Sequence, residues 1–248
     1  MKVLVIGGGA AGLMAAIAAA QRGAQVCLIE PNERLGKKIN ITGKGRCNVP
    51  NDTDLEGLLA HIPRNGRFLY SALSRFTSRD AMAFFEGLGV PLKTERGNRV
   101  FPVSDRSFDI SGALERRLRA LKVRLVRDRA VSLDVSGGAI RGVTGEKGAY
   151  PAQAVILATG GVSYPATGST GEGHRMAAAV GHTVTPLQGS LVPLREKGNT
   201  CARCRNDNSA GCQRPDDSLQ VRAVHPWRQP RVLDHLPRPF HTLGLRSI

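Results

Sequence analysis

The sequence is poor in the features that mark several large classes of protein. Only 4% of its 248 residues are aromatic, one of them Trp, and its five cysteines are an odd number spread over a long chain. This cysteine usage argues against the disulfide framework of a small secreted protein and favours a reducing compartment. Hydrophobic residues make up 41% of the chain, which is enough for a packed core and excludes a fibrous or wholly disordered protein.

Long hydrophobic runs are also missing. The stretch 3–20 has no charge and follows a single lysine, so its hydropathy is similar to that of a signal peptide or a membrane span. Four glycines interrupt this stretch, it is short for a span, and no second apolar stretch of comparable length follows. We therefore expect a cytoplasmic protein without membrane association.

Negative charge is scarce relative to positive charge. The chain has 35 Lys and Arg against 20 Asp and Glu, a formal net charge of +15. This balance favours partners that carry phosphate, but it does not by itself indicate nucleic acid.

Two residue types disappear after residue 197. Residues 1–197 contain 8 Lys and 9 Glu, whereas residues 198–248 contain neither but hold 8 Arg, 5 of the 14 Pro and 3 of the 5 Cys. The surfaces of ordinary globular domains use both Lys and Glu. We therefore predict one domain over residues 1–197 and an irregular, disordered tail over residues 198–248.

A glycine-rich turn joins the first predicted strand to the first predicted helix. Gly7, Gly9 and Gly12 follow the spacing Gly-x-Gly-x-x-Gly, and Glu30 closes the next apolar strand. In such a unit the backbone N–H groups and the helix N-terminus face a pyrophosphate, and the carboxylate accepts hydrogen bonds from an adenosine ribose. The pattern predicts a site for the ADP part of NAD or FAD, and the charge of Glu30 disfavours a ribose 2′-phosphate.

The hydrophobic periodicity predicts the elements around this turn. A domain of the α/β class follows: a three-layer FAD/NAD(P)-binding, Rossmann-like domain with a parallel sheet, an antiparallel meander and a helical excursion over about residues 50–110. The expected strands are 2–6, 25–29, 123–126, 130–135, 139–144, 148–150 and 154–157, and the expected helices are 11–22, 111–121 and several within 54–89.

A second glycine-rich and basic loop lies at residues 42–48, with the sequence Thr-Gly-Lys-Gly-Arg-Cys-Asn. Its N–H groups and cations can reach the same pyrophosphate or the edge of a flavin. The loop is not a P-loop, because Gly45 rather than Ser or Thr follows Lys44. A plain solvated loop is the alternative interpretation of this pattern.

Four motifs together resemble a bacterial family of FAD-dependent flavoproteins that includes aminoacetone oxidases and a reductase acting on bile-acid intermediates. The motifs are the glycine turn with Glu30, the loop 42–48, residues 99–106, and residues 158–165 followed by Thr-Gly-Ser-Thr-Gly-Glu-Gly at 167–173. The resemblance covers about residues 1–195. It implies an FAD-dependent oxidoreductase that transfers hydride between the flavin and a small organic substrate or NAD(P)H, without a nucleic-acid partner.

The resemblance also implies which residues hold the cofactor, although it assigns no catalytic side chain. Lys44 stands where this family has a small residue, and Glu172 stands where the wider superfamily often has Asp. Cys47 next to a flavin could take part in redox chemistry, but we interpret it as a packing residue, and we interpret His174 and His182 as structural or solvent-facing. The implied cofactor contacts are Gly7, Gly9, Ala11 and Gly12 at the pyrophosphate, Glu30 at the ribose, Ala130 and Val131 at the adenine, and Lys38, Gly45, Arg46, Cys47, Asn48, Ala158, Thr159 and Gly160 along the FAD.

The tail after residue 197 matches neither the substrate-side domain nor the last flavin-binding segment of that family. Its composition is typical of a GC-rich reading frame translated out of phase, so we hypothesise a frameshift near residue 197. An incomplete copy with weak FAD retention and reduced or no activity is then expected. Two alternatives are an NAD-linked dehydrogenase and a non-catalytic nucleotide-binding or nucleic-acid-binding protein, the latter with a zinc site at Cys201, Cys204, Cys212 and His225.

Overall fold

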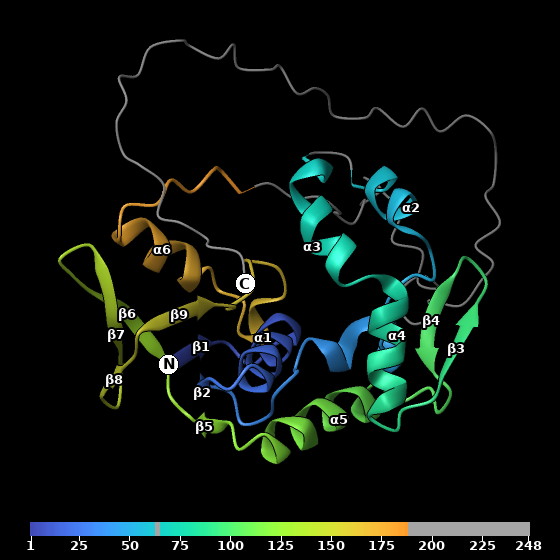
Figure 1. The fold of residues 1–248 in the computed structure, drawn as a ribbon, viewed down its shortest axis with the longest axis horizontal. Helices are drawn as coiled ribbons and strands as arrows, with labels where there is room; N and C mark the ends of the chain where they lie inside the picture. Colours follow the sequence, from blue (N-terminus) through green and yellow to red (C-terminus); the bar gives the residue numbers. More distant parts are fainter. Residues whose placement is uncertain (63–64, 188–248) are drawn as a thin grey trace, which may run out of the picture. The chain divides into compact units, whose positions relative to one another are not determined.

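The computed structural model describes residues 1–62 and 65–187 (Figure 1). A four-stranded sheet with the order β5-β2-β1-β9 forms the centre of this part, and each pair of neighbouring strands is parallel. Helix α1 (Ala10–Gln21) connects β1 to β2. The strands are β1 (Lys2–Ile6), β2 (Gln25–Ile29), β5 (Arg124–Val126) and β9 (Ala154–Leu157).

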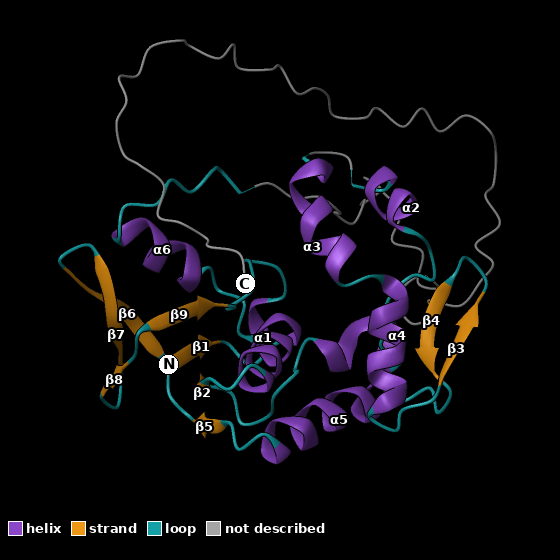
Figure 2. Ribbon diagram, viewed as in Figure 1, coloured by secondary structure: helices purple, strands orange, loops and turns teal. Residues whose placement is uncertain are grey.

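Alternating side chains of the sheet enter two separate hydrophobic cores, as the period of two in a strand requires. Val3 and Val5 of β1 pack in one core with Leu13 of α1 and Leu114 of α5 (Ser107–Ala120). Leu4 and its alternating neighbours pack in the second core with residues of the antiparallel meander and of α6 (Glu172–Ala179). The result is the predicted three-layer arrangement, with helices, parallel sheet and meander in succession (Figure 2).

The meander consists of three antiparallel strands in the order β6-β7-β8. Their observed bounds lie within a residue or two of the predicted ones. The strands are β6 (Ala130–Ser136), β7 (Ala139–Gly145) and β8 (Ala149–Pro151).

The excursion between β2 and α5 is not purely helical. Besides its helices it holds the antiparallel hairpin β3 (Leu92–Glu95) and β4 (Arg99–Pro102), which the sequence analysis did not predict. In the connecting turn Gly97 and Asn98 have φ of 77° and 57°, a conformation that Gly and Asn tolerate and that suits tight hairpins. The helical segments are η1 (Ile39–Gly45), α2 (Leu55–Ala60), η2 (Gly66–Leu69), α3 (Tyr70–Arg75) and α4 (Ser78–Gly87), and a further short one, η3 (Pro165–Thr167), follows β9.

The remaining differences from the prediction are small. Helix α5 begins at Ser107 rather than at 111, because Ser107 is buried and its hydroxyl donates to the carbonyl oxygen of Asn40, which anchors an extra turn. Within the described residues no helix is both long enough and apolar enough to cross a membrane. The predicted boundary at residue 197, the tail, the frameshift and the tail zinc site all lie outside the described residues.

Candidate dinucleotide-binding site

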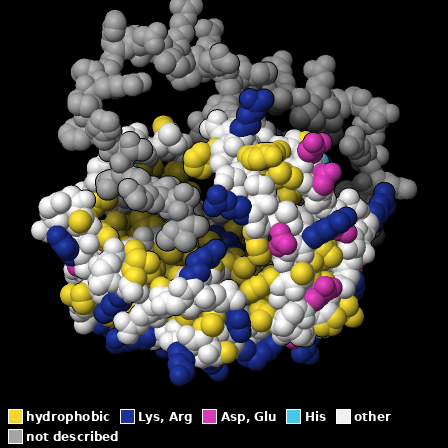
Figure 3. All heavy atoms as spheres, in the orientation of Figure 1, with side chains coloured by type: hydrophobic (Ala, Val, Ile, Leu, Met, Phe, Trp, Pro, Cys, Tyr) yellow, Lys and Arg dark blue, Asp and Glu magenta, His cyan; other side chains and the backbone are white. Residues whose placement is uncertain are grey.

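A cavity of about 880 Å³ opens where β1, β2 and β9 end. Ile6, Ile29 and Leu157, the last residues of these strands, line it together with the residues that follow each of them. Ligands of open parallel sheets bind at the carboxyl ends of the strands, at the point where successive connections leave a strand in opposite directions. Strand β1, with β2 on one side and β9 on the other, forms such a point. In Figure 3 the hollow shows hydrophobic side chains inside and Lys and Arg side chains near its edge.

The glycine turn forms one wall of this cavity. A side chain on Gly12 would overlap the carbonyl oxygen of Gly7, and one on Gly7 would overlap that of Ala158 at the end of β9. These two glycines therefore allow the turn, α1 and β9 to pack closely. Gly9 lines the cavity and has no neighbour within 4 Å of the position that a Cβ would take, so its backbone is open to a ligand.

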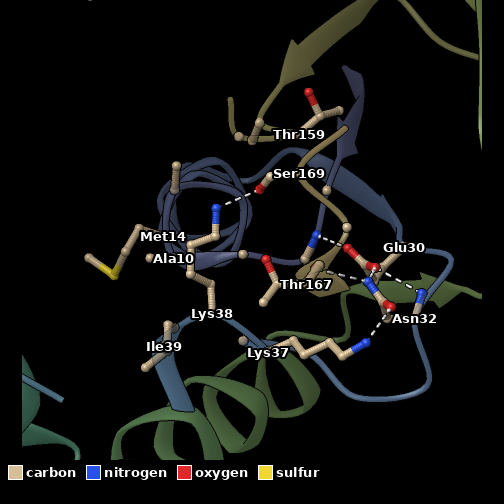
Figure 4. Close-up of a pocket in the computed structure, with 18 of the residues that line it drawn as sticks. Ala10, Met14, Glu30, Asn32, Lys37, Lys38, Ile39, Thr159, Thr167 and Ser169 are labelled. Atoms are coloured by element: carbon tan, nitrogen blue, oxygen red, sulfur yellow. Dashed lines mark hydrogen bonds between the residues drawn. The ribbon is translucent and has the colours of Figure 1, made fainter. Parts of the chain in front are cut away.

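Glu30 closes this wall at the end of β2. Its Oε2 accepts from the Gly8 N–H at 2.6 Å, and its Oε1 accepts from the Asn32 N–H at 2.8 Å and from Asn32 Nδ2 at 2.6 Å (Figure 4). A carboxylate has about four acceptor positions. The charge of Glu30 thus fixes the turn and retains acceptor capacity toward the cavity, as a ribose hydroxyl requires.

Two consecutive lysines connect this wall to the loop after β9. Lys38 Nζ donates to Ser169 Oγ at 2.7 Å (Figure 4) and to the Ser163 carbonyl at 2.8 Å. Lys37 Nζ donates to the Ala166 carbonyl at 2.8 Å and lies 3.4 Å from Asn32 Oδ1. All of these acceptors are uncharged, so neither ammonium group is neutralised by these bonds.

The charges that line the cavity favour an anionic ligand. Its acidic lining residues within the described chain are Glu30 and Glu172, and Glu172 is already paired with Arg129 at 2.5 Å. Arg34, Lys37 and Lys38 also line the cavity, which leaves an excess of positive charge beside the N–H groups of the glycine turn. This combination fits the two negative charges of a dinucleotide pyrophosphate.

A buried carboxylate holds the segment 128–130, where Ala130 lines the cavity. Asp128 is 2% exposed and accepts from the Tyr150 hydroxyl at 2.6 Å and the Arg129 N–H at 2.8 Å. Burial opposes the charged form of Asp128, but these hydrogen bonds outweigh it, so its pKa lies below the ordinary value. The hydrogen bond from the Tyr150 hydroxyl to Asp128 also raises the pKa of Tyr150 to about 12.

The loop 42–48 brings Cys47 and Asn48 to the cavity. Burial raises the pKa of the Cys47 thiol, although a hydrogen bond with Thr42 acts in the opposite direction. The thiol is therefore protonated at neutral pH and is a poor nucleophile, which favours our interpretation of Cys47 as a packing residue.

The structure brings most of the predicted contact residues together. Gly12 packs beneath the turn, Gly45 and Arg46 lie away from the cavity lining, and Val131 is 56% exposed at an irregular point of the β6–β7 pairing. The predicted residues that line the cavity are Gly7, Gly9, Ala11, Glu30, Lys38, Cys47, Asn48, Ala130, Ala158, Thr159 and Gly160.

Several lining residues were not predicted. Asn32 follows Glu30 by two residues, and Glu172 lies in the Thr-Gly-Glu-Gly stretch, which the sequence analysis noted without assigning a role. His174 also lines the cavity, and its Nδ1 is the buried side-chain polar atom without a hydrogen-bond partner among residues 1–62 and 65–187. Those same ranges contain no group of three His, Cys, Asp or Glu residues that could hold a metal ion.

Curated relatives match most of this chain. The 3-dehydro-bile acid delta(4,6)-reductase of Clostridium scindens is 38% identical over 207 residues, which are 82% of this chain and 49% of the relative. The ribosomal RNA dihydrouridine synthase of Escherichia coli is 30% identical over 200 residues, 77% of this chain and 47% of the relative. The chain thus spans about half the length of the curated relatives it matches.

Solved structures share the fold. The Mycobacterium smegmatis Sdh1 complex in the apo form matches with a TM-score of 0.55 and 23% identity, over 73% of this chain and 38% of that chain. This likeness confirms the predicted Rossmann-like fold, and neither alternative function gains support from any of the comparisons.

The family model described as "HI0933-like protein Rossmann domain" matches residues 1–244. The match confirms the resemblance stated from the motifs, and with it FAD as the cofactor of this family. This chain therefore belongs to the HI0933-like Rossmann family.

Proposed function

We propose that the chain binds FAD in this cavity and belongs to an FAD-dependent oxidoreductase. The observation that carries the proposal is that the glycine turn, Glu30 and the two lysines without an acidic partner in these bonds meet at the carboxyl ends of β1, β2 and β9. When bound, the flavin supplies a two-electron acceptor and donor for hydride. The residues of the chain bind and orient the cofactor: the N–H groups of the turn and Lys38 hold the pyrophosphate, and Glu30 holds the ribose.

The proposal extends to an apolar, unsaturated organic compound as the substrate, with NAD(P)H as a further electron donor. Hydrophobic side chains from α1, α4, α5 and the segment before α4 contribute to the lining of the cavity. Burying a charged group there would carry a desolvation cost without compensation. The similarity to a bile-acid reductase points in the same direction. These side chains are Met14, Phe76, Ala81, Phe85, Ile110 and Leu114.

Binding of the cofactor is tested first, with the full chain. Titration calorimetry with ADP, FAD and NAD is expected to show uptake of ADP and FAD, with FAD lost on gel filtration if retention is weak. Circular dichroism must show that the sample is folded. Folded protein that takes up neither ADP nor FAD would contradict the proposal.

The substrate class is tested on protein held in excess FAD. A neutral steroid enone is expected to perturb the flavin absorption spectrum, whereas an aliphatic amino acid is not. Phe76→Ala removes a lining side chain and should weaken binding of the enone about three- to tenfold, the value of a partly buried aromatic ring. Phe68→Ala is the matched control, because Phe68 is 86% exposed and does not line the cavity. Equal effects of the two variants would sink the proposed substrate class.

A further inference from the structure

Arg46 lies directly before the cavity-lining Cys47, yet its guanidinium group is bound elsewhere. Nη1 and Nη2 form a two-pronged pair with the Glu95 carboxylate at 2.9 and 3.0 Å. Nη1 also lies 3.0 Å from Asp105 Oδ1, and the guanidinium carbon lies 3.9 Å from the centre of the Phe101 ring. These contacts use the planar, multiple-donor geometry that distinguishes Arg from Lys.

The segment that Arg46 anchors has an unusual backbone. Gly43, Lys44, Gly45 and Cys47 all have positive φ, of 56°, 58°, 84° and 62°. Non-glycine residues adopt this conformation at a conformational cost, so a segment of this kind persists only where its surroundings fix it. Two residues of this segment, Cys47 and Asn48, line the cavity beyond the glycine turn.

The hairpin β3–β4 provides the surroundings that the segment needs. Phe101 is 2% exposed, and a Cβ on Gly43 would lie 3.0 Å from its ring, so the ring is close to Gly43 as well as to Arg46. Lys93 completes the cluster at 2.7 Å from Asp105 Oδ2 and 3.6 Å from Glu95 Oε1. Two cations and two carboxylates thus form one charge-balanced network behind the segment.

We propose that Arg46 is a positioning residue, which holds residues 43–48 against the β3–β4 hairpin so that Cys47 and Asn48 face the cavity. The positioning of the loop does not depend on the proposed FAD function. Only its consequence rests on that function, namely that the network orders the wall next to the cofactor. The inference differs from the expectation of the sequence analysis, in which Arg46 itself contacts FAD.

The first test measures the order of the loop without any cofactor. Cys47 is 6% exposed and Cys27, in β2, is 4% exposed, so alkylation of both under native conditions is slow in the wild type. Labelling is followed by peptide mass spectrometry. Arg46→Met should accelerate labelling of Cys47 about tenfold and leave Cys27 unchanged, because only local opening is eased. Arg46→Lys and Glu95→Gln should give intermediate rates.

Controls separate local from global effects. Arg106→Met removes an exposed arginine that pairs with Asp109 at 3.5 Å and has no part in the Arg46 network, and it should leave both labelling rates unchanged. If the Arg46→Met variant unfolds, both of its cysteines will be labelled equally fast. The milder variants Arg46→Lys and Glu95→Gln then decide whether Arg46 positions the loop. Cys47 rates equal to the wild type in these two variants would overturn the inference.

The second test separates positioning from direct contact. Arg46→Met should shift the absorption band of bound FAD and lower the affinity for FAD, while the affinity for ADP stays unchanged. Equal losses of ADP and FAD affinity would show that Arg46 holds the ADP part directly and would overturn the inference. Failure of the wild type to bind ADP or FAD would refute the proposed function, and the Cys47 labelling would still decide the role of Arg46.

Discussion

The two walls of the cavity are stabilised in different ways. The glycine turn depends on backbone packing without room for a side chain, and its main side-chain partner, Glu30, lies 22 residues from Gly8. The wall at residues 43–48 depends on Arg46 and on carboxylates 49 and 59 residues further along the chain, and the side chains of all three are 30–42% exposed. The first wall therefore tolerates no added atom at Gly7 or Gly12, whereas the second is sensitive to charge and ionic strength.

The largest effect is expected at Gly12. Gly12→Ala places a methyl group on the carbonyl oxygen of Gly7, which is backbone and cannot move aside, so the turn and α1 must separate. We expect loss of cooperative thermal unfolding and of FAD binding. Gly9→Ala is the matched control, because nothing lies within 4 Å of its Cβ position. It should leave the unfolding midpoint nearly unchanged and weaken only FAD binding; a stable, FAD-binding Gly12→Ala variant would remove the contrast between the walls.

A smaller effect is expected at Glu30. Glu30→Gln removes the charge and replaces one acceptor oxygen with an amide donor, which opposes the N–H groups of Gly8 or Asn32. A hydrogen bond to a charged group contributes about 1.5–3 kcal/mol, so FAD affinity should fall roughly ten- to a hundredfold in titration calorimetry. Adenosine binding should fall in parallel. An unchanged affinity for both ligands would exclude Glu30 from the ribose site.

The smallest effect is expected in the segment 128–130. This segment is intermediate between the two walls, because a buried charged side chain, Asp128, fixes a stretch of backbone there. Tyr150→Phe removes a hydrogen bond to Asp128 and should lower the unfolding midpoint by about 2–4 °C at neutral pH. The lowered pKa of Asp128 stabilises the fold above its unfolded-state value, and this contribution is lost as the pH falls through the folded-state value.

The raised pKa of Tyr150 acts at the other end of the pH scale. Its contribution is present below about pH 10 and is lost as the pH rises toward about 12. The difference in midpoint between the wild type and Tyr150→Phe should thus be constant near neutrality and shrink in acid and in strong base. A difference that is independent of pH would exclude the Asp128–Tyr150 pair as its source.

Local sequence patterns were sufficient for the central sheet and the ADP wall. The strands 2–6, 25–29 and 154–157 have the bounds that were predicted, because strands of a parallel sheet are short apolar runs, here buried in the first two and half-buried in the third. Gly7, Gly9 and Glu30 were identified because their spacing reflects contacts within one β-α-β unit. The hairpin β3–β4 was missed, since both strands are only four residues long and β3 is polar and mostly half-buried, so the buried Val100 and Phe101 of β4 form no recognisable pattern with it.

The sequence by itself determined the fold class, the position of the glycine turn and the sign of the ligand's charge, because each depends on neighbours along the chain or on summed charge. Only the tertiary structure decided that Arg46 binds Glu95 rather than the cavity and that Val131 lies on the exposed surface. It alone also brought Asn32 and Lys37 beside the loop after β9. These outcomes depend on pairings between segments far apart in the chain, and the direction of a long charged side chain follows the partner that folding places within its reach.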